Sequence, residues 1–213
     1  MNQYPSRLLT EFFLLFILMP VSLVFDFPIW IKGVLVLSGF VYIIVVLRKM
    51  GVSLRIKKSI DWKSFWKRTF ITFLLIAIIT MAYVWYTDAS LLFFVPKNDP
   101  YLFVFILLVY SLLSVWPQEL IYRTFFINRY ETIFKSNALL VFVNAIVFSL
   151  AHLFFRNTLV LILTFLGGLL FGLTYLKFRS TTLVTIEHAL YGNWLFTVGM
   201  GQMLAFPGME IPA

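Results

Sequence analysis

The sequence predicts an all-α protein, a polytopic transmembrane helix bundle. The prediction depends on composition, the length of the apolar runs and the placement of charge. Of the 213 residues, 62% are hydrophobic and 12% are charged, whereas soluble domains have about 45–50% apolar and about 25% charged residues. A spanning helix needs about 20 mostly apolar residues. We therefore expect a single integral membrane domain over residues 1–213.

The chain contains seven apolar runs. Backbone groups in lipid must be hydrogen-bonded internally, so each run is expected to be a helix. The first run follows Arg7 and superficially resembles a signal peptide, but it lacks a small-residue cleavage pattern before Asp26, so we expect an uncleaved span. The seven expected spans are Leu8–Phe25, Ile29–Leu47, Thr69–Tyr86, Tyr101–Trp116, Ala138–Phe155, Asn157–Leu176 and Thr181–Met200.

Basic residues lie mostly in alternate connections between these runs. If the N-terminus is cytoplasmic, 14 of the 17 Lys and Arg residues fall on the cytoplasmic side, and Lys32, Lys97 and Arg156 fall outside. Cytoplasmic connections are typically enriched in Lys and Arg. We therefore expect the N-terminus to be cytoplasmic and the C-terminus to lie outside.

The connection from Arg48 to Arg68 interleaves its bases with Trp62, Phe65 and Trp66. This pattern favours a cytoplasmic amphipathic segment on the anionic leaflet of the membrane. We therefore expect this segment to contact membrane lipids. The net charge of +8 is interpreted as a topology signal, and we do not expect nucleic acid as a partner.

Two further features limit chemistry and packing. The chain has no cysteine, which excludes disulfides, thiolate catalysis and cysteine metal sites. Gly168 and Gly172 form a G-x-x-x-G pair in the sixth run. Small residues at this spacing predict close approach of two helices, a packing feature with no chemistry of its own.

Ionisable residues inside the apolar runs are the candidates for a functional site, because each costs about 2.5–3.5 kcal/mol in a membrane. Glu119 and Arg123 are spaced i, i+4 and can pair on one helix face; alone, they also fit a structural salt bridge. His152 shares a face with Phe148, and alone it also fits a hydrogen-bonded core residue. The ionisable residues within or beside the runs are Glu11, Glu119, Arg123, His152, Glu187 and His188.

As a set, Glu119, His152, His188 and the nearby amide of Asn193 suit hydrolysis. A carboxylate can take a proton from water, and imidazole and amide groups can donate to an oxyanion. The same carboxylate and imidazoles could instead hold Zn²⁺ with an open water position. For Glu119 to reach the depth of His152, the fourth helix must continue to about Arg129, with a bend at Pro117.

These residues resemble the sequence boxes of the CPBP family, the CAAX proteases and bacteriocin-processing enzymes, also called the Abi family. The boxes are Glu-x-x-x-Arg at Glu119, Phe-x-x-x-His at Phe148, and a third box that begins at His188. The resemblance covers Trp116 to Met200, with a family-like catalytic core expected over about 101–200. It implies an intramembrane endopeptidase that acts on a membrane-associated or lipidated protein or peptide, with its site recessed from the cytoplasmic side.

From these residues we derive a hypothesis for their roles. Glu119 activates water, His152 orients that water or shares its proton, His188 (with Asn193 if a bulge allows) stabilises the oxyanion, and Arg123 fixes the Glu119 carboxylate and favours its charged form. Phe148 matches the first position of the second box. Members have been called metalloproteases, but water activation by glutamate without an essential metal is the better-supported mechanism, so we expect no required cofactor and keep Zn²⁺ as the alternative.

The sequence departs from the family pattern at two positions. Gln118 replaces the first of two glutamates, the one that usually activates water, and an amide cannot act as a general base. Asn193 lies five residues after His188 rather than four, and Gly192 occupies the expected place. An ideal helix would turn Asn193 away from the site, so a π-bulge near Gly192 would be needed to restore its position.

Two other functions fit the same residues. Gln118 also suits a catalytically altered scaffold that binds a membrane partner without cutting it. A small transporter with Glu119 and the histidines as a proton relay is the third alternative, but the expected internal repeat is not visible. The Pro-Gln-Glu version of the first box resembles a bacterial branch of the family, so we expect the plasma membrane of a bacterial cell.

Overall fold

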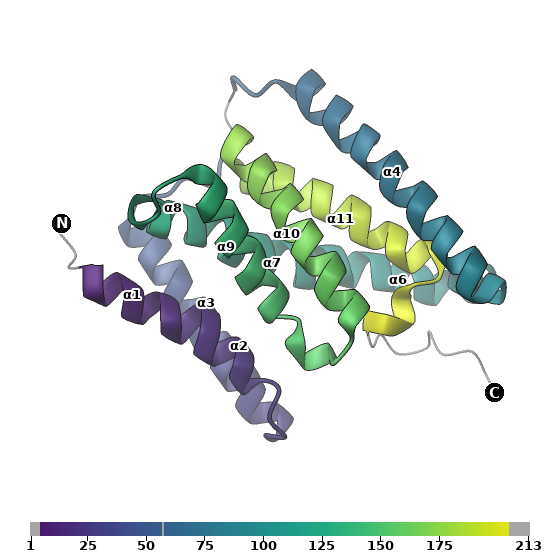
Figure 1. Ribbon diagram of the computed structural model, residues 1–213, viewed down its shortest axis with the longest axis horizontal. Helices are drawn as coiled ribbons and strands as arrows, with labels where there is room; N and C mark the ends of the chain where they lie inside the picture. The colour runs from purple at the N-terminus through teal and green to yellow at the C-terminus, as the bar shows by residue number, and fades with distance from the viewer. Residues whose placement is uncertain (1–4, 57, 205–213) are drawn as a thin grey trace. The chain divides into compact units, whose positions relative to one another are not determined.

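The computed structural model describes residues 5–56 and 58–204, and every regular element within them is helical (Figure 1). The predicted all-α class is therefore confirmed. Contacts divide the chain into two compact units, which are described separately below. Unit 1 comprises Met1–Arg55 and Leu120–Arg179, and unit 2 comprises Ile56–Glu119 and Ser180–Ala213. The predicted orientation of the C-terminus falls on residues 205–213, and Lys57 belongs to the predicted basic segment; both lie outside the described residues.

Among the described residues, five helical segments are long and apolar enough to cross a membrane, which indicates an integral membrane protein. The first and seventh predicted spans are also helical, over Pro5–Ser22 and Thr181–Val198. They are not among the five, and in Thr181–Val198 the polar residues Glu187, His188 and Asn193 lower the hydropathy. The five segments are Ile29–Lys49, Trp62–Leu91, Pro100–Ile133, Asn137–Phe155 and Thr158–Phe178.

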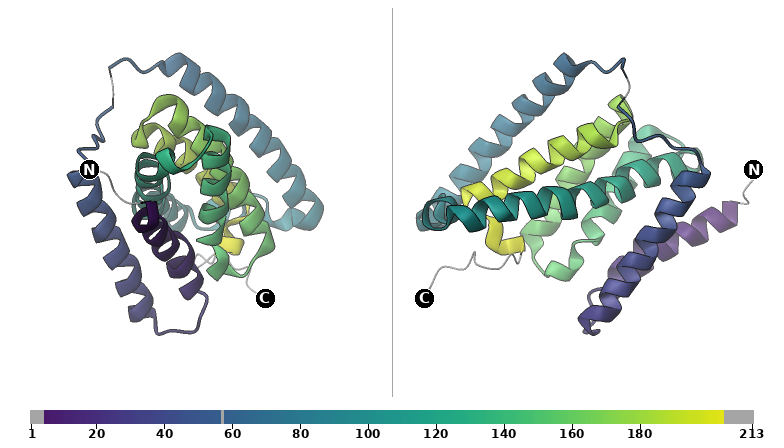
Figure 2. Two further views of the ribbon diagram at one scale, coloured as in Figure 1. Left: turned by 60° about the vertical axis from the view of Figure 1, so that its left-hand side comes forward. Right: turned by 180° about the vertical axis from the view of Figure 1, so that it is seen from behind.

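Unit 1 is organised around two long helices, α9 and α10, which lie side by side (Figures 1 and 2). Gly168 and Gly172 of α10 lie against Ala145 and Val141 of α9. The G-x-x-x-G pair therefore lies at a close helix–helix contact, as predicted. The elements of unit 1 are α1 (Pro5–Phe13), η1 (Leu14–Leu18), α2 (Met19–Ser22), α3 (Ile29–Lys49), η4 (Leu120–Phe125), α8 (Phe126–Tyr130), η5 (Glu131–Ile133), α9 (Asn137–Leu150), η6 (Leu153–Phe155) and α10 (Thr158–Phe178).

Gly168 is the position where this contact is tightest. A Cβ atom placed there would lie 2.7 Å from Ala145 Cα, which is backbone and cannot move aside. We therefore expect Gly168→Ala to lower the free energy of unfolding by about 1–3 kcal/mol through overpacking, measured as a lower Tm in detergent. Gly33 in α3 is the matched control, because a Cβ there meets nothing within 4 Å. A Gly168→Ala protein as stable as Gly33→Ala would contradict this packing.

Glu11, one of the ionisable residues in the first predicted span, belongs to a structural cluster in unit 1. Its carboxylate accepts two hydrogen bonds from Arg129, at 2.8 and 2.7 Å. Tyr130 donates to it at 2.8 Å and Tyr42 at 2.6 Å. These bonds tie α1 to α3 and α8, which gives Glu11 a role in joining helices.

Unit 2 is organised around α11 (Thr181–Val198), and α4 (Trp62–Asp88) runs alongside it (Figures 1 and 2). The Tyr191 hydroxyl donates to the Thr69 carbonyl at 3.1 Å, and Trp194 Nε1 donates to the Thr80 hydroxyl at 2.9 Å. These bonds satisfy polar groups at the contact between the two helices. The other elements of unit 2 are η2 (Ala89–Leu91), α5 (Phe94–Asn98), α6 (Pro100–Val109), η3 (Tyr110–Val115), α7 (Trp116–Glu119) and η7 (Gly201–Leu204).

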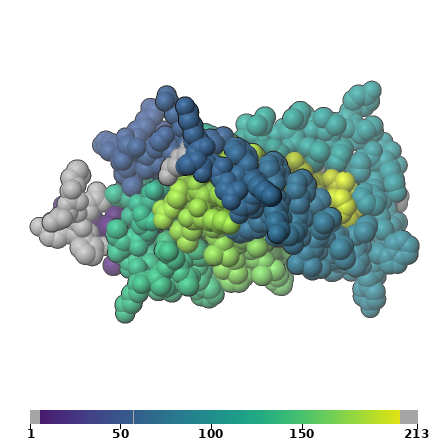
Figure 3. All heavy atoms as spheres, turned by 90° about the horizontal axis from the view of Figure 1, so that it is seen from above, coloured from purple at the N-terminus to yellow at the C-terminus, as the bar shows by residue number. Residues whose placement is uncertain are grey.

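The outer face of α4 is apolar and exposed, and its atoms lie at the front of Figure 3, in blue. The face toward α11 carries the buried residues Phe65, Thr69, Thr80 and Val84. An apolar exposed face opposite a packed one is what lipid contact requires of a spanning helix. The exposed side chains of this helix include Phe70, Ile71, Leu74, Leu75, Ile78, Ile79 and Trp85.

The predicted amphipathic segment, Arg48 to Arg68, does not form a helix of its own. The described residues between Val52 and Asp61 are not helical. The aromatic residues Trp62, Phe65 and Trp66 instead form the first turns of α4. Asp61 caps this helix, because its side chain accepts a hydrogen bond from the Ser64 backbone N–H at 2.9 Å.

The fourth predicted helix continues well past its apolar run, as one helical segment from Pro100 to Ile133. It passes from unit 2 to unit 1 between Glu119 and Leu120. The irregularity expected at Pro117 takes the form of a π-helical turn one turn earlier, at η3, where the Trp116 N–H bonds the Ser111 carbonyl. Proline has no N–H to donate, so the helical hydrogen-bond pattern is interrupted at Pro117. A π-helical turn just before it is consistent with this interruption.

Candidate active site

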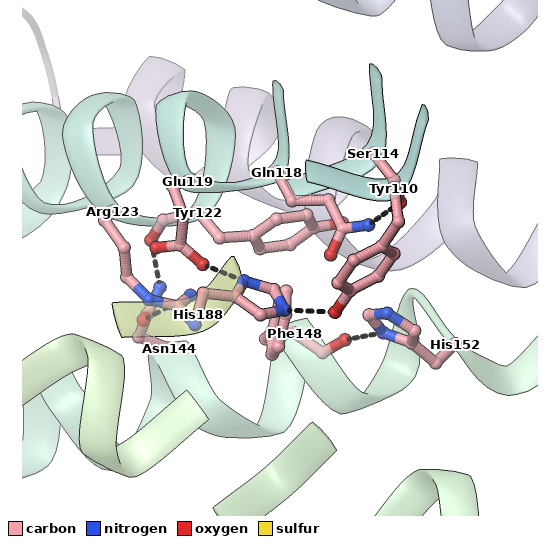
Figure 4. Close-up of polar contacts among 10 residues, drawn as sticks. All are labelled: Tyr110, Ser114, Gln118, Glu119, Tyr122, Arg123, Asn144, Phe148, His152 and His188. Carbon is pink, nitrogen blue, oxygen red and sulfur yellow. Dashed lines mark hydrogen bonds and ion pairs between the residues drawn. The ribbon is translucent and has the colours of Figure 1, made fainter. Parts of the chain in front are cut away.

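Glu119 and His188 form a buried pair in unit 2 (Figure 4). Glu119 ends α7, His188 lies in the middle of α11, and α7 packs against α11. His188 Nδ1 lies 2.7 Å from Glu119 Oε1, and the Glu119 residue is 0% exposed. If Nδ1 carries a proton, it donates to this carboxyl oxygen. The two residues are 69 positions apart in the chain.

The other ring nitrogen of His188 contacts Tyr110, the first residue of η3. The Tyr110 hydroxyl lies 3.2 Å from His188 Nε2. Figure 4 shows the resulting chain of side chains from Glu119 through His188 to Tyr110. With Nδ1 protonated, a neutral imidazole has its lone pair on Nε2, so the phenol donates to it. The sequence prediction did not include Tyr110.

Gln118 points toward η3 and is bonded within its own helical segment. Its Nε2 donates to the Ser114 hydroxyl at 2.8 Å. Its buried Oε1 has no hydrogen-bond partner among the described residues. The amide that replaces the usual first glutamate therefore keeps a buried acceptor atom that no described residue satisfies.

Asn193 is held in a contact between helices. Its Nδ2 donates to the Ser111 hydroxyl of η3 at 3.0 Å. The π-bulge near Gly192 that would bring Asn193 to the site is not present, because α11 is α-helical from Thr181 to Val198. The other interpretation of the sequence, that Asn193 is a packing residue, agrees with this contact. The wider turn lies in the facing segment η3 instead. Without the bulge, Asn193 lies on a different part of the helix surface from His188.

Glu187 precedes His188 but has different surroundings. It is 0% exposed, and its Oε1 accepts a hydrogen bond from the Tyr191 hydroxyl at 3.0 Å. Because Tyr191 also donates to a carbonyl of α4, this carboxylate belongs to the packing of α4 on α11.

Arg123 is fully buried in unit 1, on the π-helical segment η4. Its Nη1 donates to Asn144 Oδ1 of α9 at 3.1 Å, and Asn144 in turn donates to the Tyr122 carbonyl (Figure 4). The guanidinium carbon lies 4.4 Å from the ring centre of Phe148, a cation–π contact. Asn144 thus helps to position the arginine, in addition to the predicted hydrogen bond between helices.

His152 follows the end of α9 in unit 1 and is half-buried. Its Nδ1 lies 2.8 Å from the Phe148 carbonyl oxygen, and its ring contacts the Phe148 ring, with 4.9 Å between centres. If Nδ1 donates to that carbonyl, Nε2 carries the lone pair, which is the tautomer a proton acceptor needs. Phe148 therefore orients the histidine four residues later in the same sequence box.

Zn²⁺ is the alternative cofactor for these residues. Within neither unit do the described residues contain a group of three His, Asp or Glu side chains arranged to hold a metal ion. In unit 2, both ring nitrogens of His188 already have hydrogen-bond partners, Glu119 and Tyr110. Coordination of Zn²⁺ by this imidazole would require one of these bonds to break.

The fold and the buried carboxylate–imidazole pair define an α-helical membrane protein with a polar site among its helices. In a comparison with family models, residues 100–195, a little under half of the chain, match the model of the Rce1-like type II CAAX prenyl endopeptidases. Residues 100–195 are therefore similar to the domain of this family, and the resemblance seen in the sequence boxes is confirmed. The matched region contains Glu119, Arg123, His152 and His188. Comparisons with curated proteins and with solved structures gave no match.

Proposed function

We propose that this protein is an intramembrane endopeptidase that hydrolyses a peptide bond of a membrane-associated or lipidated protein. The family of the matched domain implies proteolysis. The observation that supports this activity most directly is the 2.7 Å contact between Glu119 and His188, in a buried part of the matched region. A carboxylate paired with an imidazole is a group that can accept and return a proton.

In the proposed reaction, Glu119 takes a proton from water, and the water oxygen bonds to the carbonyl carbon of the substrate. The carbonyl oxygen becomes an oxyanion, and hydrogen-bond donors on the His188 side stabilise it. When the C–N bond breaks, Glu119 returns the proton to the leaving amine. Because the sequence boxes include them, we assign His152 to orienting the water and Arg123 to fixing the Glu119 carboxylate.

We further propose that the reaction needs no resident metal, because both ring nitrogens of His188 are engaged. Treatment with EDTA or 1,10-phenanthroline should leave the turnover of the purified protein within about twofold of its untreated value. Chelators remove a metal from an open catalytic site. A large loss of turnover that added Zn²⁺ restores would contradict this proposal.

We also propose that the protein lies in a plasma membrane with its N-terminus in the cytoplasm. The distribution of Lys and Arg supports this orientation. The substrate bond would then be presented from the membrane or its cytoplasmic face. A lipid-modified cysteine near the terminus of a peptide would hold that peptide at the membrane, because the lipid partitions into the bilayer.

The test is a cleavage assay with protein purified and reconstituted in liposomes. The probe is a peptide with a farnesylated CAAX sequence, compared with the same peptide lacking the lipid, and mass spectrometry identifies new peptide termini. Endopeptidase activity predicts a new terminus from the lipidated peptide. If the peptide is bound and recovered intact, the protein is a scaffold on the protease fold, and the proposed hydrolysis is wrong.

A further inference from the structure

Gly192 and Tyr110 are sterically complementary. Gly192 lies four residues after His188 on α11, so both residues are on the same face of the helix. A Cβ atom built on Gly192 would overlap the hydroxyl oxygen and two ring carbons of Tyr110. Any side chain at position 192 would therefore displace the phenol, and only glycine leaves room for it.

The Tyr110 ring is held firmly in this place. The residue is 8% exposed and belongs to an apolar cluster with Val95, Ile106, Val115 and Phe196. Its ring meets the Phe196 ring edge to face, with 4.9 Å between centres. Among the described residues, His188 Nε2 is the hydrogen-bond partner of the Tyr110 hydroxyl. The phenol is thus buried in apolar surroundings, with its single polar atom directed at the catalytic imidazole.

We propose that the Tyr110 hydroxyl is a catalytic group of this site, the donor that stabilises the oxyanion of the tetrahedral intermediate. This inference rests on the proposed endopeptidase function. In the resting site the hydroxyl donates to His188 Nε2, and rotation about the Cζ–O bond turns the same proton toward the substrate oxygen. A charged oxyanion is a stronger acceptor than a neutral imidazole, so the developing charge favours this rotation.

This role does not change which groups transfer protons in the reaction. Tyr110 keeps its proton throughout and contributes a hydrogen bond. Glu119 takes the proton of water and returns it to the leaving amine, as described above. The family resemblance leads us to expect an asparagine at the position of Gly192. The Tyr110 phenol, which comes from η3, occupies the space that the asparagine side chain would fill.

The first test is Tyr110→Phe, which removes one oxygen atom and keeps the packing on Phe196. We expect kcat for the farnesylated peptide to fall about 10²-fold, the usual scale for loss of one oxyanion donor, with KM and Tm nearly unchanged. Tyr191→Phe is the matched control, because it removes another buried hydroxyl of unit 2, bonded to Thr69 and Glu187. We expect its turnover to stay within about twofold of the parent.

The second test replaces the Tyr110 phenol with an amide at position 192. Tyr110→Ala should lose turnover as Tyr110→Phe does. Adding Gly192→Asn to it should restore part of the loss, because the space is then open and an amide lies one helical turn from His188. Adding Gly192→Leu instead fills the same space without a donor and should restore nothing.

The outcomes separate the inference from the function on which it depends. A parent protein that cleaves the peptide, with Tyr110→Phe equally active, would overturn the role of Tyr110 alone. Recovery by leucine as good as recovery by asparagine would do the same, since it would show that the ring only fills space. A parent protein with no turnover would overturn the proposed hydrolysis and this inference with it.

Discussion

Glu119→Gln is expected to lower kcat for peptide cleavage by about 10⁴-fold, the upper range for loss of a general base. The amide retains an oxygen that can accept the hydrogen bond from His188 Nδ1, so the contact between α7 and α11 is preserved. It cannot take a proton from water. Turnover of the farnesylated peptide in liposomes, with enzyme in excess, measures the effect.

Glu187→Gln is the matched control for this substitution. Glu187 is equally buried, has the same side chain and lies in the same unit, but it accepts a hydrogen bond from Tyr191. We expect Glu187→Gln to retain turnover within a few-fold, with any change following its Tm. If Glu119→Gln cleaves the peptide at the parental rate, Glu119 does not activate the water.

His188→Asn is expected to lower kcat by about 10³-fold. The asparagine amide can replace Nδ1 as the donor to Glu119, but it provides nothing at the position of Nε2, where the imidazole contacts Tyr110. Loss of the imidazole removes a proton-handling group and the partner that positions the phenol. The folded state should be preserved, because the buried carboxylate keeps a donor.

Trp194→Phe provides the comparison on the same helix. Trp194 bonds Thr80 of α4 and packs on Phe73, so its loss affects packing between helices without touching the carboxylate–imidazole pair. Its turnover should stay near that of the parent. A His188→Asn protein that is fully active, or one whose loss is matched by Trp194→Phe, would remove His188 from the mechanism.

Much of the fold could be predicted from the sequence, because a membrane restricts the choice of structure. Long apolar runs must be helical in lipid, and a G-x-x-x-G pair is useful only where two helices approach closely. The contact of Gly168 with Ala145 follows this rule. The continuation of the fourth helix beyond its apolar run could also be inferred, since Glu119 would otherwise lie at the membrane surface.

The candidate site could be predicted only in part. Glu119 and His188 could be singled out because an ionisable side chain in an apolar run is costly. Tyr110 could not, since a tyrosine in such a run has little cost and the chain has ten. The sequence indicated Tyr110 only indirectly. Gly192 leaves a space on the face of α11 that carries His188, and a side chain from another helix fills that space.

The position of Asn193 could not be predicted from the sequence for a similar reason. The sequence places Asn193 one residue too far from His188, and a π-bulge in that helix was the simplest local correction. The wider turn belongs instead to η3, before Pro117, and it carries the Ser111 hydroxyl that Asn193 binds. Which of two facing helices contains the irregular turn depends on their packing, and a pattern within one helix does not contain that information.

The most direct test of the central claim, that Glu119 and His188 act as one catalytic unit, is a double-mutant cycle on peptide turnover. The cycle compares the parent with Glu119→Gln, His188→Asn and the protein carrying both. Residues that act together are strongly non-additive. We expect the double variant to be no slower than Glu119→Gln alone, whereas a further loss approaching the full effect of His188→Asn would show that the two residues act independently.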